Sequence, residues 1–253
     1  MCVPTEIPLF PAALPQRTVS GDRPKLAILM PARDEAAMIG EVIASVRRHF
    51  PQALVVVIDD SSRDGTAEVA AKAGAVVLPL LVSLGAWGAI QTGMRYALKR
   101  DCDTCVTMDA DGQHLATEIP KLLKALEREQ AEVAIGAYPE RGSRARRIAW
   151  RFFRTLTGFE FADLTSGFRA YRGRALALLA SPRATLLDYQ DIGVLLLLRA
   201  QGFRIAETSV AMRPRLYGKS RVFYSWWRVG VYLFQTLVLC LASSAFKKRS
   251  PIV

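Results

Sequence analysis

The sequence is poor in the residues that build metal centres and disulfide frameworks. Its 253 residues include four cysteines and two histidines. Cys102 and Cys105 form a single CxxC, and no second pair completes the ligand set of a zinc site. We therefore interpret this pair as strand packing by reduced thiols, in a cytosolic setting.

Long hydrophobic runs and targeting signals are also missing. Hydrophobic residues make up 51% of the chain, and the mean hydropathy is +0.17, which is far from the value of a multi-span membrane protein. The N-terminus has no basic and then apolar signal peptide. Pro4, Pro8, Pro11 and Pro15 predict an irregular leader over residues 1–24 instead. We find no internal repeat, no low-complexity segment and no GxGxxG after a strand, so a dinucleotide-binding fold is not favoured.

Acidic residues are scarce in the second half of the chain. Residues 141–249 hold 20 Lys and Arg against 5 Asp and Glu, whereas the rest is slightly acidic and the whole chain carries +11. Such a basic surplus suits nucleic acid, an anionic membrane or phosphorylated substrates, and charge alone does not choose among them.

Short apolar runs alternate with amphipathic stretches through the first 137 residues. We expect strands over 26–30, 54–58, 75–78, 103–108 and 131–137, with helices over 36–50, about 64–73, 86–100 and 117–130. Pro31 is expected to end the first strand, and Ser62 or Asp64 to cap the second helix. The less regular second half predicts helices over 144–157 and 192–200, a loop entering a strand over 163–172, and a strand over 203–212. Apolar strands alternating with helices favour an α/β fold with a parallel sheet covered on both faces.

Three of the expected strands end in polar clusters. These are "PARDE" (31–35), "DDSSRDGT" (59–66) and "DADGQH" (109–114). Ligands of open parallel sheets bind beyond the carboxyl ends of the strands, so we expect the three clusters to meet on one rim.

Asp109 and Asp111 place two hard oxygen donors at the end of a strand. A turn there can aim both at one point, which suits Mg²⁺ or Mn²⁺ and, through the cation, a pyrophosphate. The alternative is that Asp109 caps a turn and Asp111 is solvated. Asp59 and Asp60 leave a similar choice, between a helix cap and a carboxylate that accepts hydrogen bonds from a nucleobase or ribose.

Six stretches in this order resemble family 2 glycosyltransferases of the dolichyl/polyprenyl-phosphate mannosyltransferase-like group. They are "ILMPARDEAAMIGEVIASV", "VVVIDDSSRDGTAEVA", "LGAWGAIQTGMRYAL", "VTMDADGQHLATEIPKLL", "DLTSGFRAYRGRAL" and "GKSR". Together they span about residues 25–221. The resemblance implies a GT-A fold, with a mostly parallel central sheet covered by helices, over 25–221.

The resemblance also implies roles for individual residues. The donor would be bound by Pro31, Arg33, Glu35, Asp59, Asp60, Gly85, Asp109 and Ala110. A Mg²⁺ or Mn²⁺ cofactor would be held by Asp109, Asp111 and Gln113. Catalytic roles would fall to Asp111, Arg147, Arg169, Lys219 and Ser220. Arg144, Arg221 and Ser166 are further candidates for binding a phosphate.

The implied reaction is an inverting transfer of a sugar from a nucleotide sugar to a polyprenyl phosphate. A lipid phosphate is already an anion at neutral pH, so this acceptor requires no general base. An alternative is transfer to a sugar or lipid hydroxyl in cell-envelope glycan assembly, which would need a base such as Asp188 or Asp191. A non-catalytic basic module that binds membrane or nucleic acid is the third hypothesis, and the DxD pair argues against it.

Three residues depart from the pattern of the group. Asp34 stands where Asn is usual, Ser83 where an Asn often precedes the Leu-Gly pair, and Trp87 where a small or polar residue is usual. These departures bear on the choice of sugar, and neither the sugar nor the nucleotide base follows from the sequence.

The segment 222–253 is rich in aromatic and aliphatic residues and ends in basic ones. Its apolar part, 229–245, is shorter than the roughly 20 residues that span a bilayer. Flanking Trp, Tyr, Arg and Lys favour an amphipathic helix lying at a membrane interface over a core or dimerisation helix. We therefore expect a cytoplasmic protein that is peripheral on the inner membrane and does not bind nucleic acid. Its oligomeric state, including a homo-oligomer, is left open.

Overall fold

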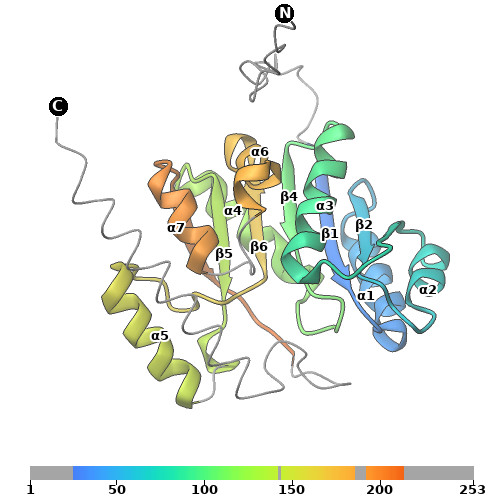
Figure 1. Cartoon of the computed structure of the whole chain (residues 1–253), viewed down its shortest axis with the longest axis horizontal. Coiled ribbons are helices and arrows are strands. Elements are labelled where there is room, and N and C mark those ends of the chain that lie inside the picture. The colour runs from blue at the N-terminus through green and yellow to red at the C-terminus, as the bar shows by residue number, and fades with distance from the viewer. Residues whose placement is uncertain (1–24, 142–143, 186–191, 214–253) are drawn as a thin grey trace, which may run out of the picture.

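The structure, a computed structural model, describes residues 25–141, 144–185 and 192–213. Within them, one seven-stranded sheet has the order β3-β2-β1-β4-β6-β5-β7 (Figure 1). The strands are β1 Leu26–Ala32, β2 Leu54–Asp59, β3 Val76–Pro79, β4 Thr104–Thr107, β5 Val133–Ala137, β6 Arg169–Arg172 and β7 Ile205–Ser209.

Helices follow most of the strands, as the alternation in the sequence predicts. The α-helices are α1 Ala36–His49, α2 Thr66–Lys72, α3 Gly85–Lys99, α4 Ile119–Arg128, α5 Arg144–Thr157, α6 Gly173–Ala180 and α7 Ile192–Ala200. Short 3₁₀ turns are η1 Ala116–Glu118, η2 Pro139–Arg141 and η3 Pro182–Ala184. The expected bounds of α5 and α7 are confirmed, whereas α6 was not expected. No side chain caps α6, which is held by its buried apolar residues instead.

The sheet is mostly parallel, which confirms the expected fold class. β3, β2, β1 and β4 pair in parallel, and β5 pairs in parallel with β7. β6 is inserted antiparallel between β4 and β5. It therefore runs toward the amino edge of the parallel strands and begins at their carboxyl edge, opposite the end of β4.

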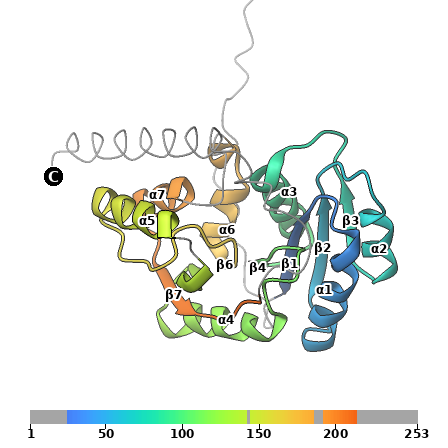
Figure 2. The same ribbon diagram turned by 90° about the horizontal axis from the view of Figure 1, so that it is seen from below.

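Helices cover both faces of the sheet (Figure 2). α1, α2 and α4 share one apolar core with one face, and α3, α6 and α7 share a second core with the other. A third cluster joins α5 to α7 and β5. The strands in the middle of the sheet are buried on both faces, which is why their sequences are apolar throughout.

Pro31 does not end the first strand, contrary to the sequence-based expectation. β1 continues to Ala32, and Pro31 pairs with Ile58 of β2. The main-chain groups of alternate residues face opposite neighbours: Ala32 accepts from Asp60 on the β2 side, and Leu29 from Met108 on the β4 side. Pro31 shares its side with Leu29, where the pairing with β4 has already stopped. Its missing N–H therefore removes no ladder bond.

The two described cysteines, Cys102 and Cys105, are buried free thiols packed under α3. Burial raises the pKa of the Cys105 thiol far above its usual value, and the nearby Cys102 and Asp103 add to the shift. A thiol that stays protonated is a poor nucleophile, and both side chains lie in the apolar core, as the packing interpretation predicts. None of the helices within the described ranges has the length and hydropathy to cross a bilayer. The segment 222–253 lies outside those ranges.

Candidate functional site

The loops that follow β1 and β2 are hydrogen-bonded to each other at the carboxyl rim of the sheet. The Glu35 backbone N–H donates to Thr66 Oγ1 at 2.9 Å, and the Ala36 N–H donates to Asp64 Oδ2 at 3.1 Å. "PARDE" and "DDSSRDGT" therefore meet, as the parallel topology predicts. Neither α1 nor α2 is capped by its own N-cap side chain; α1 instead receives a carboxylate from the neighbouring loop.

Asp34 adopts the left-handed backbone conformation, with a φ of 52°. Its carboxylate accepts the Arg63 N–H at 2.6 Å, and its own N–H donates to Ser62 Oγ at 2.9 Å. Asp and Asn are the non-glycine residues that best tolerate this conformation. Asp in place of the usual Asn at this position is therefore a substitution that the turn accepts.

Asp64 has a pKa below its usual value of 3.8. Desolvation by burial opposes this shift, but hydrogen bonds from Thr66 and Ala36 to the carboxylate outweigh it. A lowered pKa in the folded state means that Asp64 stabilises the fold above about pH 4, and that this stabilisation is lost as the pH falls below that value. The effect is small because Asp64 is exposed.

Asp60 accepts three hydrogen bonds from the start of α3. Its carboxylate takes Ser83 Oγ–H at 2.7 Å, the Leu84 N–H at 2.7 Å and the Gly85 N–H at 3.2 Å. Arg33 Nη1 donates in turn to Ser83 Oγ at 2.8 Å. The cap interpretation of Asp60 is thus correct, although the helix is α3 and not the one that follows β2. Ser83, which the sequence analysis noted only as a departure from the pattern of the group, thus links Asp60 to Arg33 through its hydroxyl.

Asp59 is also buried, and its Oδ1 accepts the Ser62 N–H at 3.2 Å. An ionised carboxylate offers about four acceptor positions, so its three donors nearly saturate Asp60, whereas Asp59 keeps more capacity to accept. Pro31 and Glu35 are half-buried at the same rim. These residues lie together, and their contact with a donor remains a prediction.

The DADGQH loop turns back on itself directly after β4. Asp111 is 3% exposed and accepts both the backbone N–H of Gln113 at 3.1 Å and its side-chain Nε2–H at 2.5 Å. The side chain of Asp109 is 45% exposed. The alternative of a solvated Asp111 is therefore wrong, whereas Asp109 faces solvent. Ala110 between them is buried in the core on the α1 side.

His114 supports the Asp109 backbone, a role that sequence reasoning missed. The Asp109 N–H donates to His114 Nδ1 at 2.8 Å, which requires that nitrogen to be unprotonated. The imidazole is buried and stacks on Phe168, with ring centroids 4.8 Å apart. Gly112 lets the turn pass α1: its φ is 78°, and a Cβ there would lie 3.0 Å from Met38 Cε.

The chain beyond β7 is bonded to the same loop. The Arg213 N–H donates to the Gln113 carbonyl at 2.9 Å, and Met212 forms an antiparallel bridge with His114. The Ala211 N–H donates to the buried Glu118 Oε2 at 2.8 Å. The basic segment that continues from Arg213 therefore starts beside the carboxylate pair.

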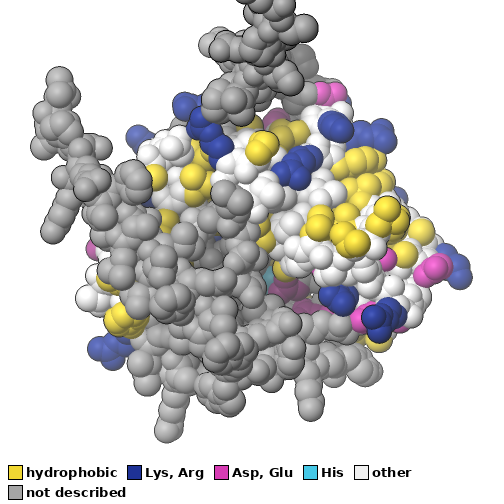
Figure 3. All heavy atoms as spheres, viewed as in Figure 1, with side chains coloured by type: hydrophobic (Ala, Val, Ile, Leu, Met, Phe, Trp, Pro, Cys, Tyr) yellow, Lys and Arg dark blue, Asp and Glu magenta, His cyan; other side chains and the backbone are white. Residues whose placement is uncertain are grey.

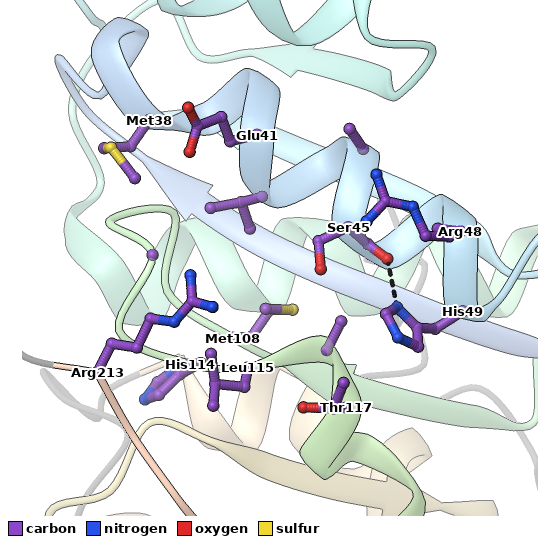
Figure 4. A pocket seen from close by; sticks show the side chains of 14 residues that line it. Met38, Glu41, Ser45, Arg48, His49, Met108, His114, Leu115, Thr117 and Arg213 are labelled. Atoms are coloured by element: carbon purple, nitrogen blue, oxygen red, sulfur yellow. Dashed lines mark hydrogen bonds between the residues drawn. The ribbon is translucent and has the colours of Figure 1, made fainter.

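A pocket of about 460 Å³ lies between α1 and the DADGQH loop (Figure 4). Ser45 and His49 line one wall, and Leu115 and Thr117 the other. Its lining includes Gly112 and His114 but neither of the paired aspartates. The pocket thus lies behind the loop, on the α1 side, and is not the place predicted for the donor.

The residues expected to grip phosphate fall into two groups. Arg169 and Ser166 are fully buried: Arg169 donates to the carbonyls of Ser166 and Leu164, and Ser166 Oγ donates to Gly136. Arg169 Nη1 has no hydrogen-bond partner among the described residues. Arg169 therefore holds the loop before β6, and its contact with phosphate stays a prediction. The second group is not described by the structure. Arg144 and Arg147 lie on α5, but their side chains are outside the described part. Residues 186–191 and 214–221 are outside it altogether, and they include Asp188, Asp191, Lys219, Ser220 and Arg221.

Trp87, the third departure noted in the sequence, has a packing role. It is 1% exposed in the core under α3, and its Nε1–H donates to the Ala184 carbonyl at 2.8 Å. The larger side chain thus joins α3 to η3 and does not face the rim.

The carboxylate pair fits a hard divalent cation in part. The two aspartates and the Gln113 amide oxygen are the oxygen ligands that Mg²⁺ and Mn²⁺ prefer. Across the described residues, no group of three or more His, Cys, Asp or Glu has the arrangement of a complete metal site. A cation here would therefore need further oxygens from a ligand and from water, as Mg²⁺ commonly does when it binds a phosphorylated substrate.

Comparison with known proteins gives a consistent result. The family profile "Glycosyl transferase family 2" matches residues 27–178. An undecaprenyl-phosphate mannosyltransferase of Micrococcus luteus is 28% identical over 214 residues, covering 78% of this chain and 87% of that protein. A polyprenol monophosphomannose synthase of Mycolicibacterium smegmatis is 28% identical over 77% of this chain and 80% of its own.

Among solved structures, glucosyl-3-phosphoglycerate synthase from Mycobacterium tuberculosis, in complex with Mn²⁺ and UDP-glucose, superposes with a TM-score of 0.67. The match covers 87% of this chain and 79% of that one at 22% identity. At that identity the likeness shows the fold, and the fold is the one that the sequence predicts.

Proposed function

Because the chain belongs to glycosyl transferase family 2 and is a GT-A glycosyltransferase, we propose that it transfers a sugar from a nucleotide sugar to a polyprenyl phosphate. The observation that carries this proposal is the pair Asp109 and Asp111 at the end of β4, one carboxylate exposed and the other buried and braced. Two relatives named for sugar transfer to lipid phosphates, each matched over most of its length, support the choice of acceptor.

The donor would lie along the rim of the sheet where the three polar clusters, PARDE, DDSSRDGT and DADGQH, are located. Asp59 is the better candidate for accepting hydrogen bonds from the nucleoside, because Asp60 is occupied by α3. Arg33, exposed and joined to Ser83, is free to turn toward a phosphate. Pro31, Glu35, Gly85 and Ala110 would line the donor site on this rim.

Asp109, Asp111 and Gln113 would hold a Mg²⁺ or Mn²⁺, which when bound neutralises charge on the donor diphosphate. Gln113 Nε2 already donates to Asp111, so its amide oxygen is the atom that faces away from that bond. Asp111 is oriented by two hydrogen bonds before any ligand arrives, which lowers the reorganisation that binding requires.

The acceptor phosphate oxygen would attack the anomeric carbon from the face opposite the leaving group. A new C–O bond forms, the bond to the diphosphate breaks, and the nucleoside diphosphate leaves with both electrons. The attacking oxygen is already anionic, so the chain has to position it and screen its charge. We propose Arg147, Lys219 and Ser220 for this task, with Arg144 and Arg221 beside them.

We further propose that residues 25–221 form the transferase domain and that 222–253 contact the membrane surface on its cytoplasmic side. The basic and aromatic composition of that segment supports the assignment. A lipid-linked acceptor would require the enzyme to work at such a surface.

A thermal-shift panel followed by a transfer assay tests the proposal. We expect one nucleotide diphosphate and its sugar conjugate to raise the melting temperature only when Mn²⁺ is present, because a ligand of the folded state stabilises it by mass action. The same donor should then label a polyprenyl phosphate, and not the corresponding prenol. Transfer to the prenol but not to the phosphate would reject the proposed acceptor.

His114 is expected to set the metal affinity through Asp109. His114→Ala removes the acceptor of the Asp109 N–H, so the apparent Mn²⁺ constant for transfer should weaken by about 10- to 100-fold, with a smaller change in kcat at saturating Mn²⁺. His114→Asn keeps an acceptor near the Nδ1 position and should recover part of the loss, whereas His114→Gln, the matched control, places its oxygen farther out and should not. If all three variants lose stability equally and keep the parental Mn²⁺ constant, the support role is wrong.

A further inference from the structure

The loop between β3 and α3, here called loop 80–84, presents apolar side chains to solvent at the donor rim. Leu81 is 100% exposed, Val82 66% and Leu84 52%. Hydrophobic side chains gather beside α3 in the space-filling view (Figure 3). Single exposed apolar residues are ordinary, but three within four positions make a local surface that suggests a contact.

Loop 80–84 is fixed by hydrogen bonds on its inner side. The Leu80 N–H donates to the Asp59 carbonyl at 2.9 Å, and its carbonyl accepts Ser61 Oγ–H at 2.8 Å. Ser83 then donates to Asp60 at 2.7 Å. With the polar groups turned inward at both ends, the outward position of Leu81 and Val82 is imposed by the fold and does not come from a loosely held loop.

Basic side chains border this apolar tip. Arg33 is exposed and bonded to Ser83 of the loop, and Arg63 is exposed in the loop that holds Leu80 through Ser61. The acidic neighbours bond inward to backbone N–H groups: Asp34 to Arg63, Asp60 to the start of α3, and Asp64 to the start of α1. Lys and Arg side chains lie on both sides of the hydrophobic patch in Figure 3.

We propose that loop 80–84 inserts its apolar tip into the surface of an anionic bilayer, with Arg63 against a lipid headgroup phosphate. A bilayer yields around a projecting side chain, whereas a protein partner would need a complementary surface on the order of 1,000 Å². Basic residues beside an apolar tip are the pattern that anionic lipid binds. The inference rests on the proposed function, because a lipid-linked acceptor gives a membrane contact at this rim its use.

Vesicle sedimentation of the full chain tests the contact without donor or acceptor. The probe is phosphatidylcholine vesicles with and without phosphatidylglycerol. We expect L81D/V82D to lower the partition coefficient on the anionic vesicles by about tenfold or more, because each apolar side chain contributes at least that factor when buried. The matched control is Q52D/Q201D, which adds the same charge at exposed positions on the opposite edge of the sheet and should stay within about twofold of the parent.

A fluorescent label reports the contact even if residues 222–253 supply most of the membrane affinity. An environment-sensitive dye at V82C, in a background with Cys2 and Cys240 changed to Ser, should shift to the blue on the anionic vesicles and be quenched by brominated lipid. Cys102 and Cys105 are buried and remain unlabelled. The same dye at Q52C should show neither effect. A dye at position 82 that stays as water-exposed as one at position 52 overturns the proposal, as does equal partitioning of L81D/V82D and its control.

Two other contacts of loop 80–84, with a second copy of the chain or with the nucleoside, would give different results in these experiments. A concentration-dependent dimer that L81D/V82D abolishes would show that a second copy covers the loop, and weaker nucleotide binding by L81D/V82D would show that the loop covers the nucleoside; either result overturns the proposal. Transfer to a short, water-soluble prenyl phosphate separates this inference from the proposed function. If loop 80–84 inserts but the parent protein does not use that acceptor, the proposed function fails alone, and if transfer proceeds while the loop stays in water, the inference fails alone.

Discussion

Replacing Asp109 and Asp111 together with alanine is expected to reduce sugar transfer by about 10³-fold or more. The two carboxylates supply most of the hard oxygen ligands that the described rim offers a cation, and charge stabilisation of this kind is worth several kcal/mol in the transition state. The double variant should also lose the Mn²⁺-dependent part of donor-induced thermal stabilisation. Steady-state transfer and thermal shift, each titrated with Mn²⁺, measure the two effects.

A single variant and a control at the opposite end of β4 sharpen this test. Asp111→Asn removes the charge but keeps the shape and one acceptor for Gln113, so the loop should persist while transfer falls. Asp103→Ala changes an exposed acid at the opposite end of β4 and should leave transfer within about twofold of the parent. Parental turnover in the double variant would reject the metal role of this pair.

Asp60→Ala is expected to lower the free energy of unfolding by about 3 kcal/mol. The substitution leaves three donors at the start of α3 without their acceptor in a buried setting, where Asp60 is 5% exposed. Each lost hydrogen bond to a charged, buried acceptor costs about 1–3 kcal/mol before water partly replaces it. Urea unfolding followed by circular dichroism measures the change, and a chain of this size should melt about 6–12 °C lower.

Asp64→Ala is the matched control, because Asp64 also bonds three donors but does so at the surface. Its carboxylate accepts from Ala36 N–H, Thr66 N–H and Thr66 Oγ1. Water can replace it there, so we expect a loss of about 1 kcal/mol or less. Equal losses in the two variants would mean that burial does not decide the contribution of Asp60.

The sequence was sufficient where the signal is local. Apolar runs alternating with amphipathic ones predict most of β1 to β5 and α1 to α4, because burial on both faces of a sheet demands continuous apolar strands. The same alternation places the polar clusters on one rim, and the hydrogen bonds between Glu35 and Thr66 and between Ala36 and Asp64 confirm it for the first two. The resemblance to family 2 glycosyltransferases came from motifs that are themselves contiguous.

Only the tertiary structure decided which neighbour each polar side chain serves. Asp60 caps a helix that begins 25 residues later, and His114 holds Asp109 while stacking on Phe168, 54 positions away in the sequence. The resemblance implies a catalytic role for Arg169, but only the fold shows that it is fully buried, because β6 is inserted between β4 and β5. Local periodicity encodes which face of an element is apolar, whereas these contacts depend on how strands distant in the chain are ordered in the sheet. That order is set by packing of the whole domain and has no signature in any short stretch of residues.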